Sequence, residues 1–362
     1  MIAAPLSFSP TTLEPLVLRA MGKRPLVSIL VGNYNYANYI RQTIESVLVQ
    51  TFTNRELIIC DDGSTDQSVA VIASYLERDR RIRLLRKPNG GHASALNAAF
   101  AECRGDLICL LDSDDVYLPQ KLERVVQACE ADPQKGVIVH RVIRVNESRR
   151  RQGVWPLSNS LPDGWYGPAL LRSGILPYTP PTSGLALRRE IAEVLFPLPT
   201  TPPLHMCPDQ VVMRLAPLTT QVGRVPEAFA EYRLHRTNTY GQRTVSAKSI
   251  HKELELCEAL WNAQRQFLFR INPEIAAHLA DLDGNCYIGL LRYLRAKLCR
   301  DPAVREYHRR YLAVSRHYEQ PKWHQFWRAS LHIPTTLFQF AANLLLGQGI
   351  LKQIAARFKG LA

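Results

Sequence analysis

The sequence lacks the features that hold small secreted domains together. Its 8 cysteines include no Cys-x-x-Cys pair, and Cys60 and Cys109 lie inside apolar runs, where a thiol behaves as a small hydrophobic residue. This pattern excludes a disulfide scaffold and favours a reducing, cytoplasmic setting. Residues 1–23 lack the pattern of a secretion signal, which is a basic start followed by an apolar stretch and a cleavage site. We expect residues 1–24 to form a flexible N-terminal tail.

Acidic residues are scarce. The 362 residues include 45 Lys and Arg but 32 Asp and Glu, which gives a formal net charge of +13. Such a balance is typical of proteins that meet nucleic acid, anionic lipid or phosphorylated substrates. Because the sequence has no zinc-finger spacing and no basic motif interleaved with aromatic residues, we predict no nucleic-acid partner. A hydrophobic share of 46% is enough for one large domain or two.

The first half of the chain alternates two hydrophobic patterns. Short apolar runs typical of buried strands alternate with segments of helical spacing. This alternation predicts an α/β fold with a mostly parallel sheet flanked by helices. The expected strands are residues 26–31, 56–60, 82–86, 107–111 and 136–143, and the expected helices are residues 39–50, 68–78, 93–102 and 119–131.

Carboxylates follow two of these strands. Asp112, Asp114 and Asp115 come directly after residues 107–111, and the acidic segment 61–66 follows residues 56–60. Ligands bind at the C-terminal edge of parallel strands. Three acids there repel one another unless a cation offsets them, and Mg²⁺ or Mn²⁺ would leave positions open for the oxygens of a diphosphate. The alternative is a loop of turn-forming and helix-capping aspartates.

Several short motifs occur in order along the chain. Together they resemble a family 2 glycosyltransferase with the GT-A fold, of the Asp-x-Asp type, and the resemblance covers residues 25–240. The motifs are Ser28-Ile29, Tyr34-Asn35, Ile44-Glu45-Ser46-Val47-Leu48, Gln50-Thr51, Asp61-Asp62-Gly63-Ser64-Thr65-Asp66, Asn89-Gly90-Gly91 and Asp112-Ser113-Asp114-Asp115.

The resemblance implies a nucleotide-sugar donor site. Asp62 would accept a hydrogen bond from the imide N–H of uracil or thymine, and Tyr34 would lie against that base. Asp112 and Asp114 match the first and last acids of the Asp-x-Asp motif, so Asp112 would contact the donor and Asp114 would hold the metal. Asp115 would then be a turn or supporting residue. Asp61 and Asp66 could equally serve the loop structure.

Two later residues also match the family pattern. Asp209 lies where inverting relatives carry the base that accepts the acceptor's proton, although a helix N-cap is the alternative. Many relatives have two adjacent acids there, whereas this chain has Pro208-Asp209. His235 lies in Tyr232-Arg233-Leu234-His235, which resembles the family's closing motif, with Asn238 after it. His235 would complete the metal site, although a core or surface histidine is the commoner case.

The rest of the chain carries less functional information. Residues 241–320 have helical spacing and predict a helical extension. Residues 321–362 contain basic and aromatic residues but no Asp or Glu, which suits a peripheral membrane contact or an amphipathic helix packed on protein. The apolar stretch 331–346 falls short of the roughly 20 residues that span a bilayer.

These features predict an inverting, metal-dependent glycosyltransferase. It would move a sugar from a UDP- or dTDP-sugar to a glycan or lipid-linked acceptor in cell-surface polysaccharide synthesis, in the cytoplasm or at the cytoplasmic face of the membrane. A nucleotidyltransferase would need a Gly-rich basic signature where Gly32-Asn33-Tyr34-Asn35 stands. The other alternative is a non-catalytic nucleotide-sugar or lipid-binding scaffold with the same fold.

Overall fold

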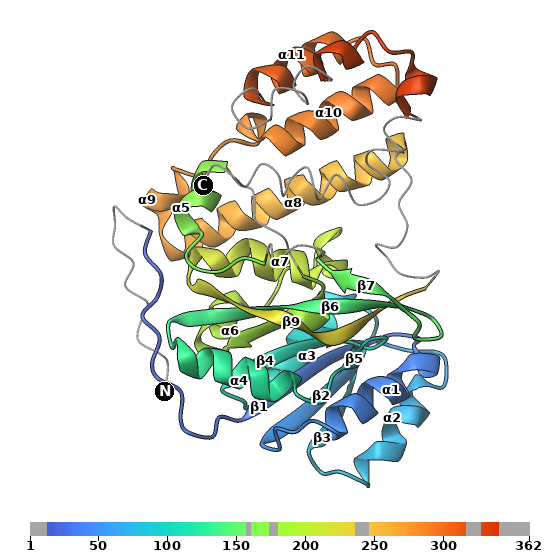
Figure 1. Ribbon diagram of the computed structural model, residues 1–362, viewed down its shortest axis with the longest axis vertical. Coiled ribbons are helices and arrows are strands. Elements are labelled where there is room, and N and C mark those ends of the chain that lie inside the picture. Colours follow the sequence, from blue (N-terminus) through green and yellow to red (C-terminus); the bar gives the residue numbers. More distant parts are fainter. Residues whose placement is uncertain (1–12, 157–160, 174–179, 236–245, 316–326, 340–362) are drawn as a thin grey trace. The chain divides into compact units, whose positions relative to one another are not determined.

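The computed structural model divides the chain into two compact units (Figure 1). Unit 1 comprises Met1–Gly167 and Tyr178–Arg236, and unit 2 comprises Pro168–Pro177 and Thr237–Ala362. Unit 1 contains every residue to which the sequence assigns a role in the site. The structure describes residues 13–156, 161–173, 180–235, 246–315 and 327–339.

Unit 1 is built on one sheet. In the described residues its strands are β1 (Val27–Asn33), β2 (Arg55–Asp61), β3 (Ile82–Arg86), β4 (Leu107–Asp112), β5 (Val116–Tyr117), β6 (Lys135–Asn146), β7 (Arg151–Trp155), β8 (Leu185–Arg188) and β9 (Gln221–Leu234). Their order is β3-β2-β1-β4-β8-β6-β9-β5, with β7 paired to β6. Strands β1 to β4 form parallel pairs with one another, and β6 and β9 form a further parallel pair. The mostly parallel α/β fold is confirmed, with β5, β7 and β8 added as antiparallel strands.

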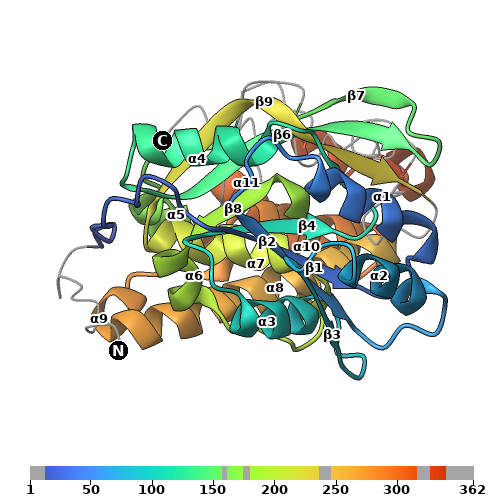
Figure 2. The same ribbon diagram turned by 90° about the horizontal axis from the view of Figure 1, so that it is seen from below.

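Helices cover both faces of this sheet. Those of unit 1 include α1 (Ala37–Leu48), α2 (Ser68–Leu76), α3 (His92–Glu102), α4 (Lys121–Ala131), α6 (Arg189–Leu195) and α7 (Pro208–Leu215). Helices α1, α2 and α4 share a buried cluster with alternate strand residues such as Ile29, Leu57 and Cys109. Helices α3 and α6 lie on the other face (Figure 2). Because both faces are buried, the central strands are continuous apolar runs.

The strand register brings the two acidic segments to one edge of the sheet. Gly32, near the end of β1, pairs with Asp112 in β4 and with Cys60 in β2, and Asn33 pairs with Asp61. The ends of β1, β2 and β4 therefore meet. The side chains that follow them share one edge, as a parallel arrangement predicts.

The N-terminal segment also contacts unit 1 where the structure describes it. Leu18 is buried, and its backbone N–H donates to the Gln134 side chain. The Leu16 N–H donates to the carbonyl oxygen of Thr219. This part of the predicted tail is thus packed on unit 1, while residues 1–12 lie outside the described residues.

Unit 2 is helical, which confirms the predicted helical C-terminal region. It contains α8 (Ala247–Ile271), α9 (Pro273–Ala276), α10 (Cys286–Leu298), α11 (Val304–Ser315) and most of α5 (Gly167–Ser173). Ser246 and Ser249 form a capping box at the start of α8. Asn285 caps α10 through the backbone N–H groups of residues 287 and 288. These caps satisfy backbone donors that a helix start leaves unpaired.

Part of the predicted interfacial segment packs inside unit 2. Trp327 is 2% exposed and Phe338 is 1% exposed, in a cluster with Tyr293, Tyr311 and Leu290. These two aromatic side chains are therefore not available to a membrane. Among the helices that the structure describes, none is long and apolar enough to cross a bilayer. Residues 321–326 and 340–362 and the predicted motif residue Asn238 lie outside the described part.

Candidate functional site

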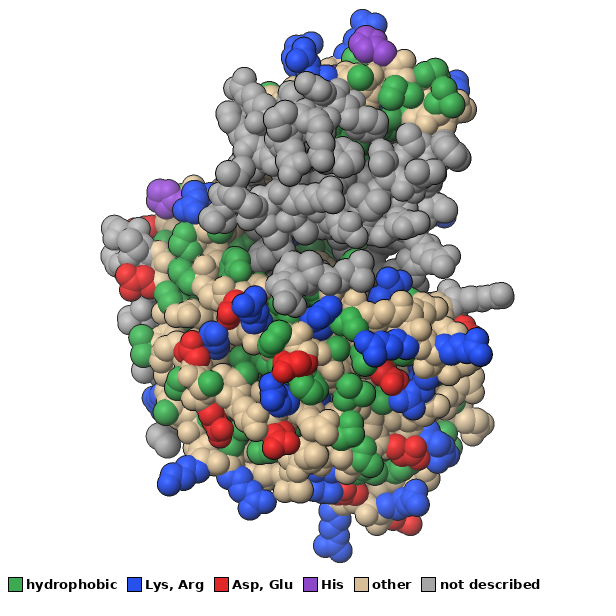
Figure 3. Space-filling view, viewed as in Figure 1, with side chains coloured by type: hydrophobic (Ala, Val, Ile, Leu, Met, Phe, Trp, Pro, Cys, Tyr) green, Lys and Arg blue, Asp and Glu red, His purple; other side chains and the backbone are tan. Residues whose placement is uncertain are grey.

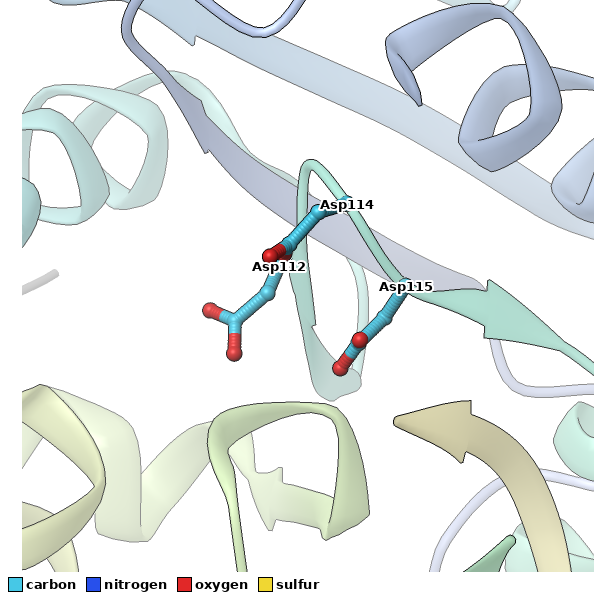
Figure 4. A group of neighbouring side chains, drawn as sticks. All are labelled: Asp112, Asp114 and Asp115. Carbon is cyan, nitrogen blue, oxygen red and sulfur yellow. The ribbon is translucent and has the colours of Figure 1, made fainter. Parts of the chain in front are cut away.

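Three carboxylates gather at the end of β4. Asp112, Asp114 and Asp115 each offer an oxygen, and these atoms all lie within 4.8 Å of one another (Figure 4). Burial raises the pKa of Asp112 and of Asp115 well above its usual range, and the neighbouring Asp114 raises both further. The fold therefore concentrates negative charge at a position where a cation would stabilise it.

The two residues predicted to hold a metal are in direct contact. His235 Nε2 lies 2.7 Å from Asp114 Oδ2, and the side chains are 2% and 10% exposed. The His235 ring stacks on Tyr39 with 5.2 Å between ring centroids and meets Tyr36 edge-on at 5.8 Å. Arg233 Nε donates to the Asp114 carbonyl oxygen at 2.8 Å, which ties the end of β9 to the acidic turn. The imidazole is thus held in one orientation beside the carboxylate.

Asp115 has a different role within the turn. Its carboxylate accepts hydrogen bonds from Ser183 Oγ at 2.6 Å and from the Arg233 backbone N–H at 2.9 Å. Ser183 Oγ also accepts from the Asp112 backbone N–H at 3.1 Å. Asp115 therefore supports the site through Ser183 and β9, as a supporting residue would. The metal role of Asp114 and His235 and the donor role of Asp112 stay predictions.

Asp209 lies near enough to these acids for its charge to act on Asp112. It is the second residue of α7, whose N-cap is Cys207, so Asp209 is not the N-cap of this helix. A carboxylate in the first helical turn is stabilised by the helix dipole. The charge of Asp209 contributes to the raised pKa of Asp112, after burial and Asp114. It also contributes, after burial and the three clustered acids, to the raised pKa of Tyr232.

Asp62 holds the loop that leads into α3. Its buried carboxylate accepts from Lys87 Nζ at 2.6 Å, from the Gly90 N–H at 3.1 Å and from the Gly91 N–H at 2.8 Å. Gly91 has a φ of +89°, which a residue with a side chain rarely adopts. Asp62 therefore already has protein partners at the carboxylate that was expected to bind uracil or thymine. Tyr34, just after β1, is 45% exposed and offers an open ring face.

The remaining acids of this loop serve its structure. Asp61 accepts from Asn33 Nδ2 at 2.8 Å and from the Ser64 N–H at 2.9 Å. Asp66 accepts from the Ala37 N–H at 3.0 Å and from the Ser68 N–H at 2.9 Å. Of the two roles that the sequence left open for these residues, the structure shows the structural one.

The sequence assigned no role to three residues near this site, although Tyr232 belongs to the closing motif and His92 follows the Asn89-Gly90-Gly91 motif. His92 is the first residue of α3, and its Nε2 lies 3.5 Å from Asp112 Oδ1. Burial lowers the pKa of His92 to about 4, against the opposing effect of Asp114 and Asp62. His205 packs against Gly91, and the charges of the clustered acids add to burial in raising the pKa of Tyr232. The glycines before His92 and the closing motif around Tyr232 were the available signals, and no pattern marks His205.

Comparison with known proteins identifies the family. A model described as "Glycosyl transferase family 2" matches residues 28–196. An uncharacterized glycosyltransferase of Nostoc sp. is 34% identical over 235 residues, which cover 63% of this chain and 70% of that protein. The hyaluronan synthase of Pasteurella multocida is 44% identical over 111 residues, 31% of this chain but 11% of the synthase. The chain thus spans about a tenth of that synthase.

Solved structures show the same fold. Staphylococcus aureus TarS 1–349 in complex with UDP matches with a TM-score of 0.53 at 15% identity, over 90% of this chain and 92% of that one. The mannosyltransferase PcManGT from Pyrobaculum calidifontis, in complex with GDP-Man and Mn²⁺, has a TM-score of 0.53 at 16% identity, over 99% and 87%. The chain belongs to glycosyltransferase family 2 and has the GT-A fold. It is a glycosyltransferase.

Proposed function

We propose that this glycosyltransferase is inverting and metal-dependent and uses a UDP- or dTDP-sugar as donor. Its acceptor is a glycan or a lipid-linked glycan of cell-surface polysaccharide synthesis. The observation that carries this proposal is the contact between Asp114 and His235 beside Asp112. The relatives named as hyaluronan and chondroitin synthases support the acceptor class, and the TarS complex with UDP supports the donor class.

The side-chain atoms of Asp114 and His235 fit as ligands of a divalent ion. Two ligands at right angles on an octahedral ion, each about 2.1 Å from it, lie about 3 Å apart. The 2.7 Å between Asp114 Oδ2 and His235 Nε2 is close to that separation, so small side-chain shifts would admit the ion. Carboxylate ligands suit Mn²⁺ or Mg²⁺. When bound, such an ion stabilises the negative charge of the departing nucleoside diphosphate.

The donor's base lies, in this proposal, between Tyr34 and Asp62. The exposed Tyr34 ring offers a flat surface for stacking. Asp62 Oδ1 already accepts from Lys87 Nζ and the Gly90 N–H. A carboxylate has about four lone-pair sites, and the Lys87 ammonium and the Gly90 and Gly91 N–H groups occupy those of Asp62. The imide N–H of the nucleotide base would therefore replace the Lys87 ammonium. Asp112, at the end of β4, contacts the donor beyond the base.

Asp209 is the proposed base for the acceptor hydroxyl. An inverting transfer needs one group that accepts the hydroxyl proton as the new glycosidic bond forms. Asp209 lies close enough to Asp112 to raise the pKa of that acid, after the larger effects of burial and Asp114. Pro208 stands where many relatives have a second acid, so Asp209 is the carboxylate that remains. Pro208 has no N–H and suits the first position of the helix.

A peripheral membrane contact at the cytoplasmic face is proposed for the basic residues of segment 321–362, without Trp327 and Phe338, which pack inside unit 2. On the face of unit 1 in Figure 3, basic side chains lie among acidic ones. Residues 321–362, in contrast, contain basic residues and no acid, which favours anionic lipid. Vesicle flotation of the full chain tests this contact, with binding expected to anionic but not to neutral vesicles. Equal recovery with both would remove it.

A thermal-shift panel tests the donor assignment without a known acceptor. A ligand that binds only the folded state raises the melting temperature. UDP, dTDP, GDP, CMP and ADP are compared with and without Mn²⁺. We expect a Mn²⁺-dependent shift with UDP or dTDP. A shift with GDP alone would contradict the donor, and no shift with any nucleotide would favour the non-catalytic scaffold.

A further inference from the structure

The proposed function gives no role to helix α1, although residues 44–51 carried part of the family resemblance. Thr43, Ser46 and Gln50 lie on one face of this segment, three and four residues apart. All three side chains are buried, and each forms a hydrogen bond with residues 113–122. One face of α1 therefore holds the part of the chain that begins at the acidic turn.

Thr43 binds the acidic turn on both sides of Asp114. Its Oγ1 lies 2.9 Å from the carbonyl oxygen of Ser113 and 2.8 Å from that of Asp115. A hydroxyl has one proton to donate, so these two carbonyl oxygens share it. The carbonyl oxygen of Asp114 itself accepts from Arg233 Nε. Side chains of α1 and β9 thus satisfy the carbonyl groups of the turn that Figure 4 shows.

This turn lies beyond the last residue of a strand. Strand β4 ends at Asp112, and the Asp115 N–H donates to the Asp112 carbonyl oxygen at 3.1 Å. Thr43 is 1% exposed, and both of its contacts with the turn are buried. A buried carbonyl oxygen that loses its donor is unfavourable. Without the hydroxyl, the turn would therefore relax to a different position.

Ser46 and Gln50 fix the segment that follows the turn. Ser46 Oγ accepts from the Tyr117 N–H at 3.1 Å. Gln50 Nε2 donates to the Leu118 carbonyl oxygen at 2.8 Å, and its Oε1 accepts from the Leu122 N–H at 3.1 Å. Because β5 and the start of α4 are held in this way, the turn is anchored on α1 at its far end as well.

We propose that Thr43 is a positioning residue for metal-dependent sugar transfer. Its hydroxyl fixes the backbone on both sides of Asp114, and so it sets where the Asp114 carboxylate lies beside His235. Removing a side chain that orients a metal ligand weakens metal binding about tenfold to a hundredfold. This inference rests on the proposed function, which assigns the metal to Asp114.

Calorimetric titration with UDP at a series of Mn²⁺ concentrations tests this role. Thr43→Val keeps the size of the side chain and removes the hydroxyl. The Mn²⁺ concentration that gives half of the gain in UDP affinity should rise about tenfold or more in this variant, while UDP affinity without Mn²⁺ should stay unchanged. Thr43→Ala should show the same rise. Thr43→Ser keeps the hydroxyl and should restore the wild-type Mn²⁺ requirement.

Thr220→Val is the matched control. Thr220 is 0% exposed, and its Oγ1 accepts from the Gly136 N–H at 3.0 Å. It directly precedes β9, whose other end leads to His235. This substitution also removes a buried hydroxyl that binds a distant backbone group. We expect it to lower the melting temperature and to leave the Mn²⁺ requirement unchanged, which separates a loss of stability from a displaced turn.

Hydrogen exchange provides a readout that needs neither metal nor donor. The Asp115 N–H donates within the turn, so its exchange rate reports how often the turn opens. In metal-free Thr43→Val this amide should exchange about tenfold faster than in the wild-type protein, as expected for the loss of a buried hydrogen bond. In Thr220→Val its exchange should not change.

The outcomes separate this inference from the function on which it rests. An unchanged Mn²⁺ requirement in Thr43→Val and Thr43→Ala would overturn the role of Thr43. So would a raised requirement that Thr43→Ser fails to correct or that Thr220→Val shares. If UDP binding by the wild-type protein does not depend on Mn²⁺, the proposed function itself is overturned, and this inference with it.

Discussion

Replacing Asp62 by alanine should release the loop between Lys87 and Gly91. The buried carboxylate is the shared acceptor for Lys87 Nζ and for the backbone N–H groups of Gly90 and Gly91. The Asp62 side chain is 3% exposed and that of Lys87 is 25% exposed. Removing the acceptor leaves a cation and two backbone donors without this partner, so the loop loses what fixes it at the start of α3.

The structure sets the size of the effect. Removing one partner of a buried ion pair costs about 3–5 kcal/mol. Because a quarter of the Lys87 side chain is exposed, the lower bound of about 3 kcal/mol applies. That free energy corresponds to about a hundredfold rise in the open population of the loop. Lys87→Met should have a smaller effect, because the two glycine N–H groups keep their acceptor.

Hydrogen exchange measures this opening directly. In Asp62→Ala, the amides of Gly90 and Gly91 should exchange about a hundredfold faster, since exchange reports local opening free energy. Asp66→Ala is the matched control, because Asp66 accepts from the Ala37 and Ser68 N–H groups and not from this loop. Unchanged protection of the two glycines in Asp62→Ala would refute the structural role of Asp62.

Three further predictions concern the proposed donor site at the C-terminal edge of the sheet. Asp114→Ala should abolish the Mn²⁺-dependent part of the UDP thermal shift, because the ion loses a ligand; a persisting Mn²⁺-dependent shift would exclude Asp114 as that ligand. Tyr34→Ala should weaken UDP binding about tenfold in calorimetry through lost stacking, whereas Tyr34→Phe should not, and equal affinities of the two variants would argue against stacking. Burial and Asp114 raise the pKa of Asp112, so the folded state disfavours its ionised form. Without metal, the free energy of unfolding therefore falls as the pH rises from 3.8, the usual pKa of an aspartate, through the raised pKa of Asp112. Asp112→Asn should therefore raise the metal-free melting temperature more at pH 8 than at pH 4.5, and an equal change at both would contradict the raised pKa.

Much of the fold could be predicted because the central strands are buried on both faces. Residues 82–86 were expected as a strand and form β3 with the same bounds. Strands β5 and β8 contain 2 and 4 residues, which is too short for an apolar period to stand out. Their antiparallel pairing depends on contacts between distant segments, such as Val116 with Glu231, and these are not written in local patterns.

The site was predictable in its carboxylates and less so in their partners. The acids after β4 follow from the position of a buried strand, whereas His235, 121 residues after Asp114, depended on the family resemblance. The partners of Asp62 could not be foreseen, because they depend on a loop conformation that includes Gly91 at positive φ. Nor could the place of His92 beside Asp112, which results from the packing of α3 on Gly32.

Asp209 is the carboxylate proposed to accept the proton of the acceptor hydroxyl during sugar transfer at a metal-dependent nucleotide-sugar site. The most direct measurement compares wild-type protein and Asp209→Asn, with Mn²⁺ and each UDP-sugar, for donor affinity and for UDP release. We expect equal donor affinity and UDP release at least about a hundredfold slower in the variant, the size typical of a lost general base. Near-normal UDP release by Asp209→Asn would contradict it.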